Sequence, residues 1–167
     1  MNSKQIVAAI SAIVLVVILV YPAVSVGAVS VSLTSTKIER ADHVFVTITD
    51  VWAHPASQAA GVGWVLISNQ SAREDLVSLQ NSSKLLGSGQ ISSGAYDSIR
   101  IEVSNVTWVF NKTTTAVGIA SPEIQGTIDF TVAAATPTMV LVTLTPQEQL
   151  IANSEYFTGT MNATLTS

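Results

Sequence analysis

The 167-residue sequence has no cysteine and few charged residues, and both absences limit what the protein can be. A domain of this composition must be stabilised by core packing, because disulfides are excluded. Charged residues make up 11% of the chain, well below the usual quarter, and the net charge is −4. No basic patch is present, which argues against nucleic acid as a partner. Because few carboxylates can titrate, we also expect a fold that tolerates acid.

The signatures of common enzymes are missing as well. The sequence contains no cysteine nucleophile, no Gly-X-Ser-X-Gly elbow, no phosphate-binding glycine loop and no His-Glu-X-X-His pair. His43 and His54, with Asp42 and Asp50 nearby, lack the spacing of a metal site and are interpreted as surface residues. No two carboxylates resemble an acid/base dyad. We therefore predict a protein that is not an enzyme, with no catalytic residue, no cofactor and no metal.

One long apolar run is present, at the N-terminus. Met1–Gln5 carries one positive charge, and Ile6–Tyr21 then runs sixteen residues without a charge. Pro22 breaks the run, and small residues follow as far as Ala28, a layout typical of a secretory signal peptide cleaved after Ala28. Sixteen helical residues reach only ~24 Å, short of the ~30 Å hydrocarbon core. A retained membrane anchor stays open as the alternative, because Ala23–Val31 is also uncharged.

Five of the seven asparagines stand in Asn-X-Ser/Thr sequons. A chain this rich in Ser and Thr would place about one or two by chance, so the excess predicts N-glycosylation after export. The alternative is that composition alone produced the tripeptides. The predicted glycan-bearing residues are Asn69, Asn81, Asn105, Asn111 and Asn162.

Beyond the leader, the sequence shows strand patterns and no convincing helical period. Short stretches rich in Val, Ile and Thr alternate with polar residues, as at 44–48 and 128–132, and end at turn residues. The pattern gives about nine or ten strands. We predict an all-β fold, an antiparallel Ig-like or prealbumin-like β-sandwich of about 8–10 strands, preceded by an N-terminal apolar helix.

The longest strand signal runs from Ser98 to Phe110. Its apolar residues change parity halfway, so a regular strand would put half of them in solvent. The first set is Ile99, Ile101 and Val103, and the second is Val106, Trp108 and Phe110. A bulge or bend near Ser104–Asn105 would bring both sets to the core.

Aromatic residues give structural signals. Gly94 stands two residues before Tyr96 at a strand entrance, which resembles a tyrosine corner, with an ordinary half-buried tyrosine as the alternative. Trp52, Trp64 and Trp108 could stack on a ligand. All three lie in or beside strands among aliphatic residues, so packing in the core or at a sheet edge is favoured.

The strand that follows the leader is the most suggestive functional feature. Val29, Val31 and Leu33 alternate with small polar residues, and a polar segment at 35–42 follows. Such a strand pairs with its own sheet, or with a neighbour's open edge by donor-strand complementation. The chain accordingly divides into residues 1–28 (signal peptide or membrane anchor), 29–36 (N-terminal strand, a candidate donor strand) and 37–167 (β-sandwich domain).

Several segments carry a family resemblance: ADHVFVTITDVWAHP, GWVLIS, DLVSLQNSSKLLGSGQISSGAYDSIRIEV and a closing Pro146-Gln-Glu-Gln-Leu. They resemble an uncharacterised family of secreted prokaryotic domains whose pattern includes V.ItdV.vH, gW, iDLL.L and pAG.Y..IRl.V. The likeness covers mainly residues 42–103. It implies an exported Ig-like or prealbumin-like β-sandwich and supplies no catalytic residue.

The overall plan also resembles the subunits of archaeal thread filaments and related pili, in which an N-terminal strand inserts into the next subunit. This resemblance implies an extracellular, N-glycosylated structural subunit that polymerises with identical subunits, with Val29, Val31 and Leu33 as donor residues. Membrane contact would come only through the N-terminal segment. The alternatives are a monomeric membrane-tethered surface glycoprotein or binding module, and a type IV pilin-like subunit that retains its helix. Two features argue against the pilin-like subunit. Its leader lacks the small residue expected before the processing point, at Lys4-Gln5-Ile6, and Pro22 is a poor continuation of a helix.

Overall fold

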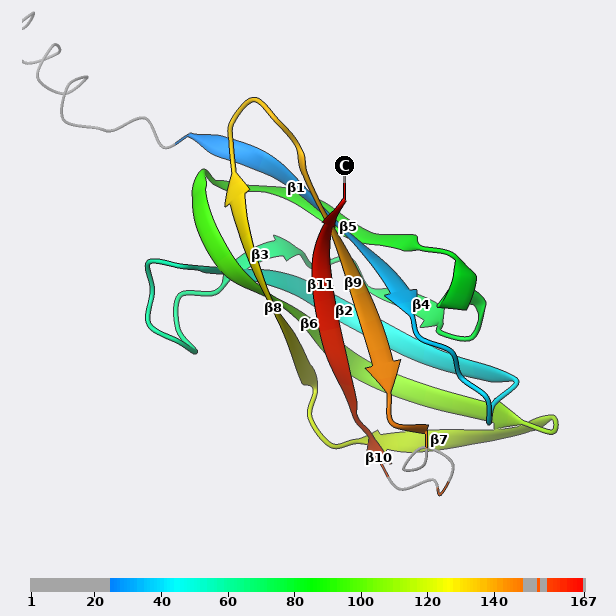
Figure 1. Cartoon of the computed structure of the whole chain (residues 1–167). Helices are drawn as coiled ribbons and strands as arrows, with labels where there is room; N and C mark the ends of the chain where they lie inside the picture. Colours follow the sequence, from blue (N-terminus) through cyan, green and yellow to red (C-terminus); the bar gives the residue numbers. More distant parts are fainter. Residues whose placement is uncertain (1–24, 149–152, 154–155, 167) are drawn as a thin grey trace, which may run out of the picture.

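The protein is described by a computed structural model that covers residues 25–148, 153 and 156–166. Strands make up nearly all of its regular structure, so the prediction of an all-β fold is confirmed (Figure 1). The expected N-terminal helix lies outside the described residues. The elements are β1 (Val26–Ser35), β2 (His43–Pro55), β3 (Val65–Ser68), β4 (Ala72–Asp75), the short 3-10 helix η1 (Ser78–Asn81), β5 (Lys84–Ser92), β6 (Gly94–Phe110), β7 (Thr113–Ile119), β8 (Glu123–Val132), β9 (Thr138–Pro146), β10 (Tyr156–Phe157) and β11 (Gly159–Thr166).

The smaller sheet has β1 in its interior. Its strand order is β11, β9, β1, β5, and β1 runs antiparallel to β5 and parallel to β9. Exposure alternates along β1: Val29, Val31 and Leu33 are fully buried, whereas Ser30 and Ser32 on the other face are half-buried. The period of two in the sequence therefore gives this strand one apolar face and one hydroxyl-bearing face.

The larger sheet is built on β2 and β6, which pair antiparallel along most of their length. The outer edge of each long strand pairs with two other strands, one after the other along its length. These are β4 and then β3 along β2, and β8 and then β7 along β6. The short β10 continues the sheet beyond β7. Four outer strands are thus held in place by two long central ones.

The expectation that the sheets are antiparallel is wrong, because they are mixed. The β1–β9 and β10–β7 pairs are parallel. Parallel neighbours need a crossover rather than a tight turn, so no local signal in the sequence marks them. The β1–β9 contact joins distant parts of the chain: the Ser35 hydroxyl donates a hydrogen bond to the Leu144 carbonyl, 109 residues further on.

The predicted bulge in β6 is confirmed. Thr47 of β2 lies opposite Asn105, whereas the next residue, Ile48, lies opposite Val103, so Ser104 has no partner in the ladder. This extra residue turns the apolar side chains before and after it to the same side of the sheet. The buried residues on its two sides are Ile99, Ile101 and Val103, and then Val106 and Trp108.

Phe110 does not follow the rest of β6 into the core. Its exposed fraction is 49%, so the prediction that the bulge would bury it is wrong. Phe110 lies at the tip of the β6–β7 hairpin, which extends beyond the ends of β1 and β9 (Figure 1). No strand of the smaller sheet covers the hairpin there.

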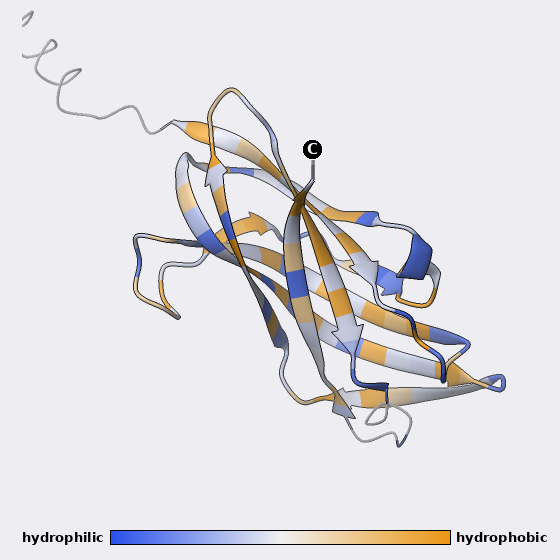
Figure 2. Cartoon of the chain, in the orientation of Figure 1, coloured by the Kyte–Doolittle hydropathy of each residue, from blue (hydrophilic) through white to orange (hydrophobic). Residues whose placement is uncertain are grey.

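The two sheets enclose one continuous apolar core, and they come close together at their borders. A Cβ atom on Gly89 of β5 would overlap the Ile67 carbonyl of β3, and one on Gly126 of β8 would lie 3.0 Å from the Met161 carbonyl oxygen of β11. Glycine at these positions lets backbones of different sheets touch. Apolar residues alternate with polar ones along the strands that line this core (Figure 2).

The two faces of β1 can be tested with a pair of substitutions. Val31→Asp places a carboxylate without a partner in the apolar core, so we expect it to lower the free energy of unfolding by about 4 kcal/mol or more. Ser32→Asp, on the opposite face, is the matched control and should cost less than about 1 kcal/mol. Urea denaturation followed by circular dichroism measures both variants. Equal losses would contradict this assignment of the faces.

Candidate functional site

All five sequon asparagines lie on the surface. Each side chain is exposed, and the five positions are spread over different parts of the fold. They are Asn69 in the β3–β4 connection, Asn81 at the end of η1, Asn105 beside the β6 bulge, Asn111 in the β6–β7 turn and Asn162 on β11. A glycosylating enzyme could reach every one of them without disturbing the core.

The candidate donor residues lie inside the chain's own sheet. Val29, Val31 and Leu33 have no exposed surface, and β1 is paired along both of its sides, with β5 and with β9. The groove that another subunit's strand would occupy is therefore filled by the chain's own β1. Donation of this strand to a neighbour would require it to leave both partners.

The Gly94–Tyr96 segment pins the start of β6. The Tyr96 ring is buried and stacks on Phe130 with 5.2 Å between ring centroids, and its hydroxyl donates a 2.8 Å hydrogen bond to the Ser92 carbonyl. Gly94 has φ of +154°, which L side chains rarely adopt. The hydrogen bond runs upstream across the β5–β6 corner, as in a tyrosine corner.

The most unusual buried group is His54, at the end of β2. Only 4% of this residue is exposed, so its interpretation as a surface residue is wrong. Its Nδ1 atom lies 2.8 Å from Asp97 Oδ1, and its Nε2 atom lies 3.1 Å from the Ala59 carbonyl oxygen. The imidazole thus connects β6, through Asp97, to the loop after β2, through Ala59.

Two more residues of the family pattern complete this cluster. The Trp64 ring lies 5.1 Å from the His54 ring, and the Arg100 guanidinium lies 4.5 Å from the centroid of Trp64. Arg100 also forms an ion pair with Glu123 of β8, at 3.0 Å. A guanidinium on an aromatic face beside a carboxylate is favourable both as a cation–π contact and as a hydrogen-bonded ion pair.

This environment favours the protonated form of His54. The hydrogen bond with Asp97 is the main cause that raises the pKa of His54 above its usual 6.5, burial opposes the rise, and the bond to the Ala59 carbonyl supports it. Both ring nitrogens face acceptors, so only the imidazolium can donate to both. A neutral ring would leave one acceptor facing a bare nitrogen.

The same bonds argue against a catalytic role for the cluster. Ser98 lies opposite His54 in the β2–β6 ladder, but neither ring nitrogen is free to accept a proton from its hydroxyl. The pocket beside them has a volume of about 110 Å³, well below that of typical ligand sites. The cluster is therefore best explained as a lock that holds the loop at 56–64.

The four residues considered for a metal site, which are Asp42, His43, Asp50 and His54, do not form one cluster. His43 instead lies 2.7 Å from Asp75 of β4, at an exposed strand start. Within the described part of the chain, no group of three or more His, Cys, Asp or Glu side chains could hold a metal ion. Among the same residues, no helix is long and apolar enough to cross a membrane.

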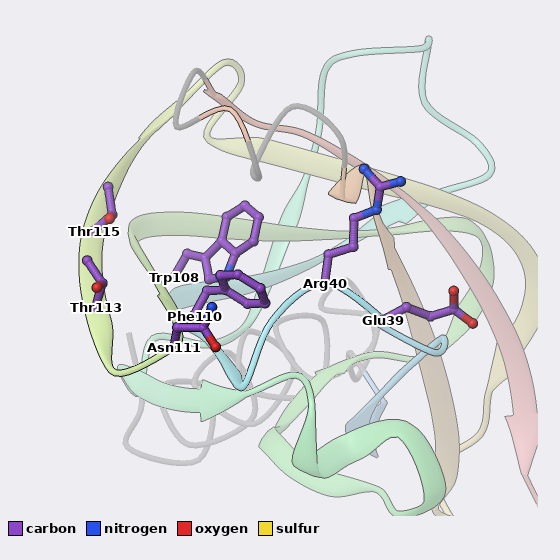
Figure 3. Close-up of a pocket in the computed structure, with 7 residues that line it drawn as sticks. All are labelled: Glu39, Arg40, Trp108, Phe110, Asn111, Thr113 and Thr115. Carbon is purple, nitrogen blue, oxygen red and sulfur yellow. The ribbon is translucent and has the colours of Figure 1, made fainter.

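A second feature, larger and more open, lies at the β6–β7 hairpin. It is a pocket of about 530 Å³ between the hairpin and the β1–β2 connection. Figure 3 shows the Trp108 and Phe110 rings side by side, with Thr113 and Thr115 on one side of them and Arg40 on the other. The lining residues are Glu39, Arg40, Trp108, Phe110, Asn111, Thr113 and Thr115.

The β1–β2 connection beside this pocket is held by one carboxylate. Glu148 Oε2 accepts hydrogen bonds from the backbone N–H groups of Glu39 and Arg40, at 3.0 and 3.1 Å. The connection is bonded at its ends as well, from Thr36 N to the Leu144 carbonyl and from Asp42 N to the Val109 carbonyl. Glu148 belongs to the closing segment of the family resemblance, and its two hydrogen bonds give this residue a structural role.

Sequence reasoning did not anticipate the pairing of His54 with Asp97, or the stacking of Arg100 on Trp64. These residues lie on separate segments that only the β2–β6 pairing brings together. One signal was present: His54, Trp64, Tyr96 and Arg100 all stand at letters of the family pattern. A pattern that names no catalytic residue can still mark side chains that hold loops in place.

Comparison with known proteins agrees with that resemblance. The chain belongs to a family described as a domain of unknown function, DUF4382, whose pattern matches residues 26–160. The match begins at the first residue of β1 and reaches into β11, and the predicted membership of an uncharacterised domain family is confirmed. No curated protein and no solved structure matches the chain. The likeness to archaeal filament subunits thus has no support from these comparisons.

The His54 lock predicts a pH dependence of stability. Because the pKa of His54 is raised in the folded state, protonation stabilises the fold fully below about pH 6.5, and this contribution disappears as pH rises through the higher folded pKa. We expect the wild-type Tm to fall over that window and the Tm of His54→Gln to stay flat there. His43→Gln, at the exposed histidine, is the control and should keep the wild-type profile. A wild-type slope in His54→Gln would contradict the lock.

Proposed function

We propose that the protein is an exported, non-enzymatic, N-glycosylated β-sandwich that is displayed at the cell surface as a closed, self-contained domain. The observation that carries this proposal is the surface position of all five sequon asparagines. Sequons that arose by chance need not all be exposed, because Asn, Ser and Thr also occur in half-buried strand positions.

The pairing of β1 supports a closed domain. The strand's three core residues are fully buried in its own sheet, and its two neighbours satisfy its backbone groups. β1 starts at Val26, directly after the apolar leader. A retained leader would therefore tether the domain to a membrane from the end of the smaller sheet.

The chemistry of the buried polar groups supports a role without catalysis. The nitrogens of His54 are both occupied, and the buried Glu74 side chain pairs with Lys84 at 2.9 Å. These groups act on strands and loops of their own chain. None of them is left as a proton acceptor facing an open pocket.

Glycopeptide mapping of the native protein tests the proposal. We expect the protein in the cell-surface or secreted fraction, with sugars on most of Asn69, Asn81, Asn105, Asn111 and Asn162. Asn153, which is exposed but outside any sequon, is the internal control and should be unmodified. A cytoplasmic protein with five unmodified sequons would refute both export and glycosylation.

Assembly of a filament by exchange of β1 is the second candidate, and one observation favours it. β1 is the first strand of the described residues yet lies in the interior of a sheet, and only the connection at 36–42 joins it to β2. If β1 moved into the same groove of another copy, every contact in the groove would be kept. The cost would fall on the connection, including the two hydrogen bonds to Glu148.

Two truncated chains distinguish the candidates. We expect residues 29–167 to elute as a monomer in size-exclusion chromatography and to show no fibres by negative-stain microscopy. Residues 37–167, which lack β1, should aggregate or unfold because the groove between β5 and β9 is empty. Fibres of the longer chain that disappear in its Val31→Asp variant would instead establish strand exchange.

A further inference from the structure

The sequon at Asn111 occupies a tight turn. Asn111 and Lys112 have φ of 47° and 63°, and Phe110 lies directly opposite Thr113 in the β6–β7 ladder. Two consecutive left-handed residues between paired strands form a type I′ turn, which fits the twist of a β-hairpin. The glycan acceptor Asn111 and the sequon threonine Thr113 are therefore held in fixed positions.

An exposed aromatic ring adjoins this acceptor. Phe110 keeps 49% of its surface open to solvent, and its ring lies 6.4 Å from that of Trp108 in an edge-on arrangement. Trp108 lies opposite Thr115, so rings and threonines form two cross-strand pairs on one face of the hairpin. The turn thus presents the Phe110 ring, about half of whose surface is not covered by any described residue.

The pocket on this face has the chemistry of a sugar site. A pyranose ring has an apolar side of C–H groups, which pack on aromatic rings, and a rim of hydroxyls, which need hydrogen-bond partners. The pocket offers the rings of Trp108 and Phe110, and around them Arg40, Glu39 and the two threonine hydroxyls (Figure 3). Its volume of about 530 Å³ lies in the range of small-molecule sites.

We propose that Asn111 is a glycosylation site with a preformed binding pocket for its glycan, and that the first sugar of this glycan lies in the pocket against Phe110. The proposal rests on the export and glycosylation proposed above. The covalent step joins Asn111 Nδ2 to the anomeric carbon of a lipid-phosphate-linked oligosaccharide. The anomeric C–O bond breaks, the lipid phosphate leaves with the bonding electron pair, and the amide nitrogen loses one proton.

The other four sequons have no such arrangement. The residue before each acceptor is small, polar or aliphatic: Ser68, Gln80, Ser104 and Met161. Only at Asn111 does an aromatic residue precede the acceptor. A sugar on Asn111 therefore gains a stacking contact that sugars on the other acceptors lack, and it should stabilise the hairpin.

A comparison of single-sequon chains tests the proposal. One chain keeps only the Asn111 sequon, and the control chain keeps only Asn162. Each is expressed with a glycan in a eukaryotic secretory host and without one in a bacterial cytoplasm, with Phe110 or with Phe110→Thr. We expect the Asn111 glycan to raise the Tm by about 3 °C with Phe110 and by less than about 1 °C with Phe110→Thr. The Asn162 glycan should give the same small change in both backgrounds.

Contact between the sugar and the ring has its own readout. The first sugar's C–H protons should shift upfield in the NMR spectrum of the Phe110 chain and return to ordinary positions in Phe110→Thr. An equal Tm rise in both backgrounds, absence of the upfield shift, or an unoccupied Asn111 in the eukaryotic host would overturn the proposal. Because that host supplies the glycan, the result is independent of whether the native cell glycosylates the protein, which the glycopeptide map decides.

Discussion

The insertion of β1 between β5 and β9 is the contact on which the smaller sheet depends. Without it, the β9–β11 pair and β5 would have no common neighbour, and the inner face of the sheet would lose three fully buried side chains, Val29, Val31 and Leu33. In a chain without cysteine, no covalent link could compensate for that loss. The larger sheet depends less on any single contact, because β2 and β6 pair along most of their length and hold four outer strands beside them.

The protein has few charged residues, and several of them form hydrogen bonds or ion pairs that hold the backbone or a loop in place. His54 and Asp97 hold the loop at 56–64, Arg100 joins Trp64 to β8 through Glu123, and Glu148 holds the β1–β2 connection. Charged side chains in this protein thus hold connections and also join strands, such as β4 to β5 through Glu74 and Lys84, whereas the core between the sheets is apolar. Much of the remaining surface consists of Ser, Thr and Asn, for which attached sugars would be a natural source of solubility.

Local patterns in the sequence predicted much of the fold, and long-range pairing was hidden from them. The alternation at Val29–Leu33 and the change of parity near Ser104 each reflect how neighbouring residues share the two faces of one strand, and both appear in the structure as expected. The parallel pairing of β1 with β9 depends on residues more than a hundred positions apart, for which no turn signal exists. Phe110 was misplaced for a similar reason: its parity is right, but the opposite sheet ends before reaching it. The contacts of His54 could not be predicted either, because its hydrogen-bond partners come from β6 and from the loop after β2.

The parallel contact between β1 and β9 has a kinetic consequence. β1, the first strand of the described residues, cannot complete its sheet until β9, which starts at Thr138, has been synthesised. During synthesis, β1 therefore stays unpaired on its β9 side, and closing so long a loop slows folding. In that interval the alternating Val/Leu segment of β1 is open to pairing with other strands, including β9 of a second copy of the chain. Whether a monomer or a strand-exchanged polymer forms then depends on whether β9 is completed before β1 meets a second copy of the chain.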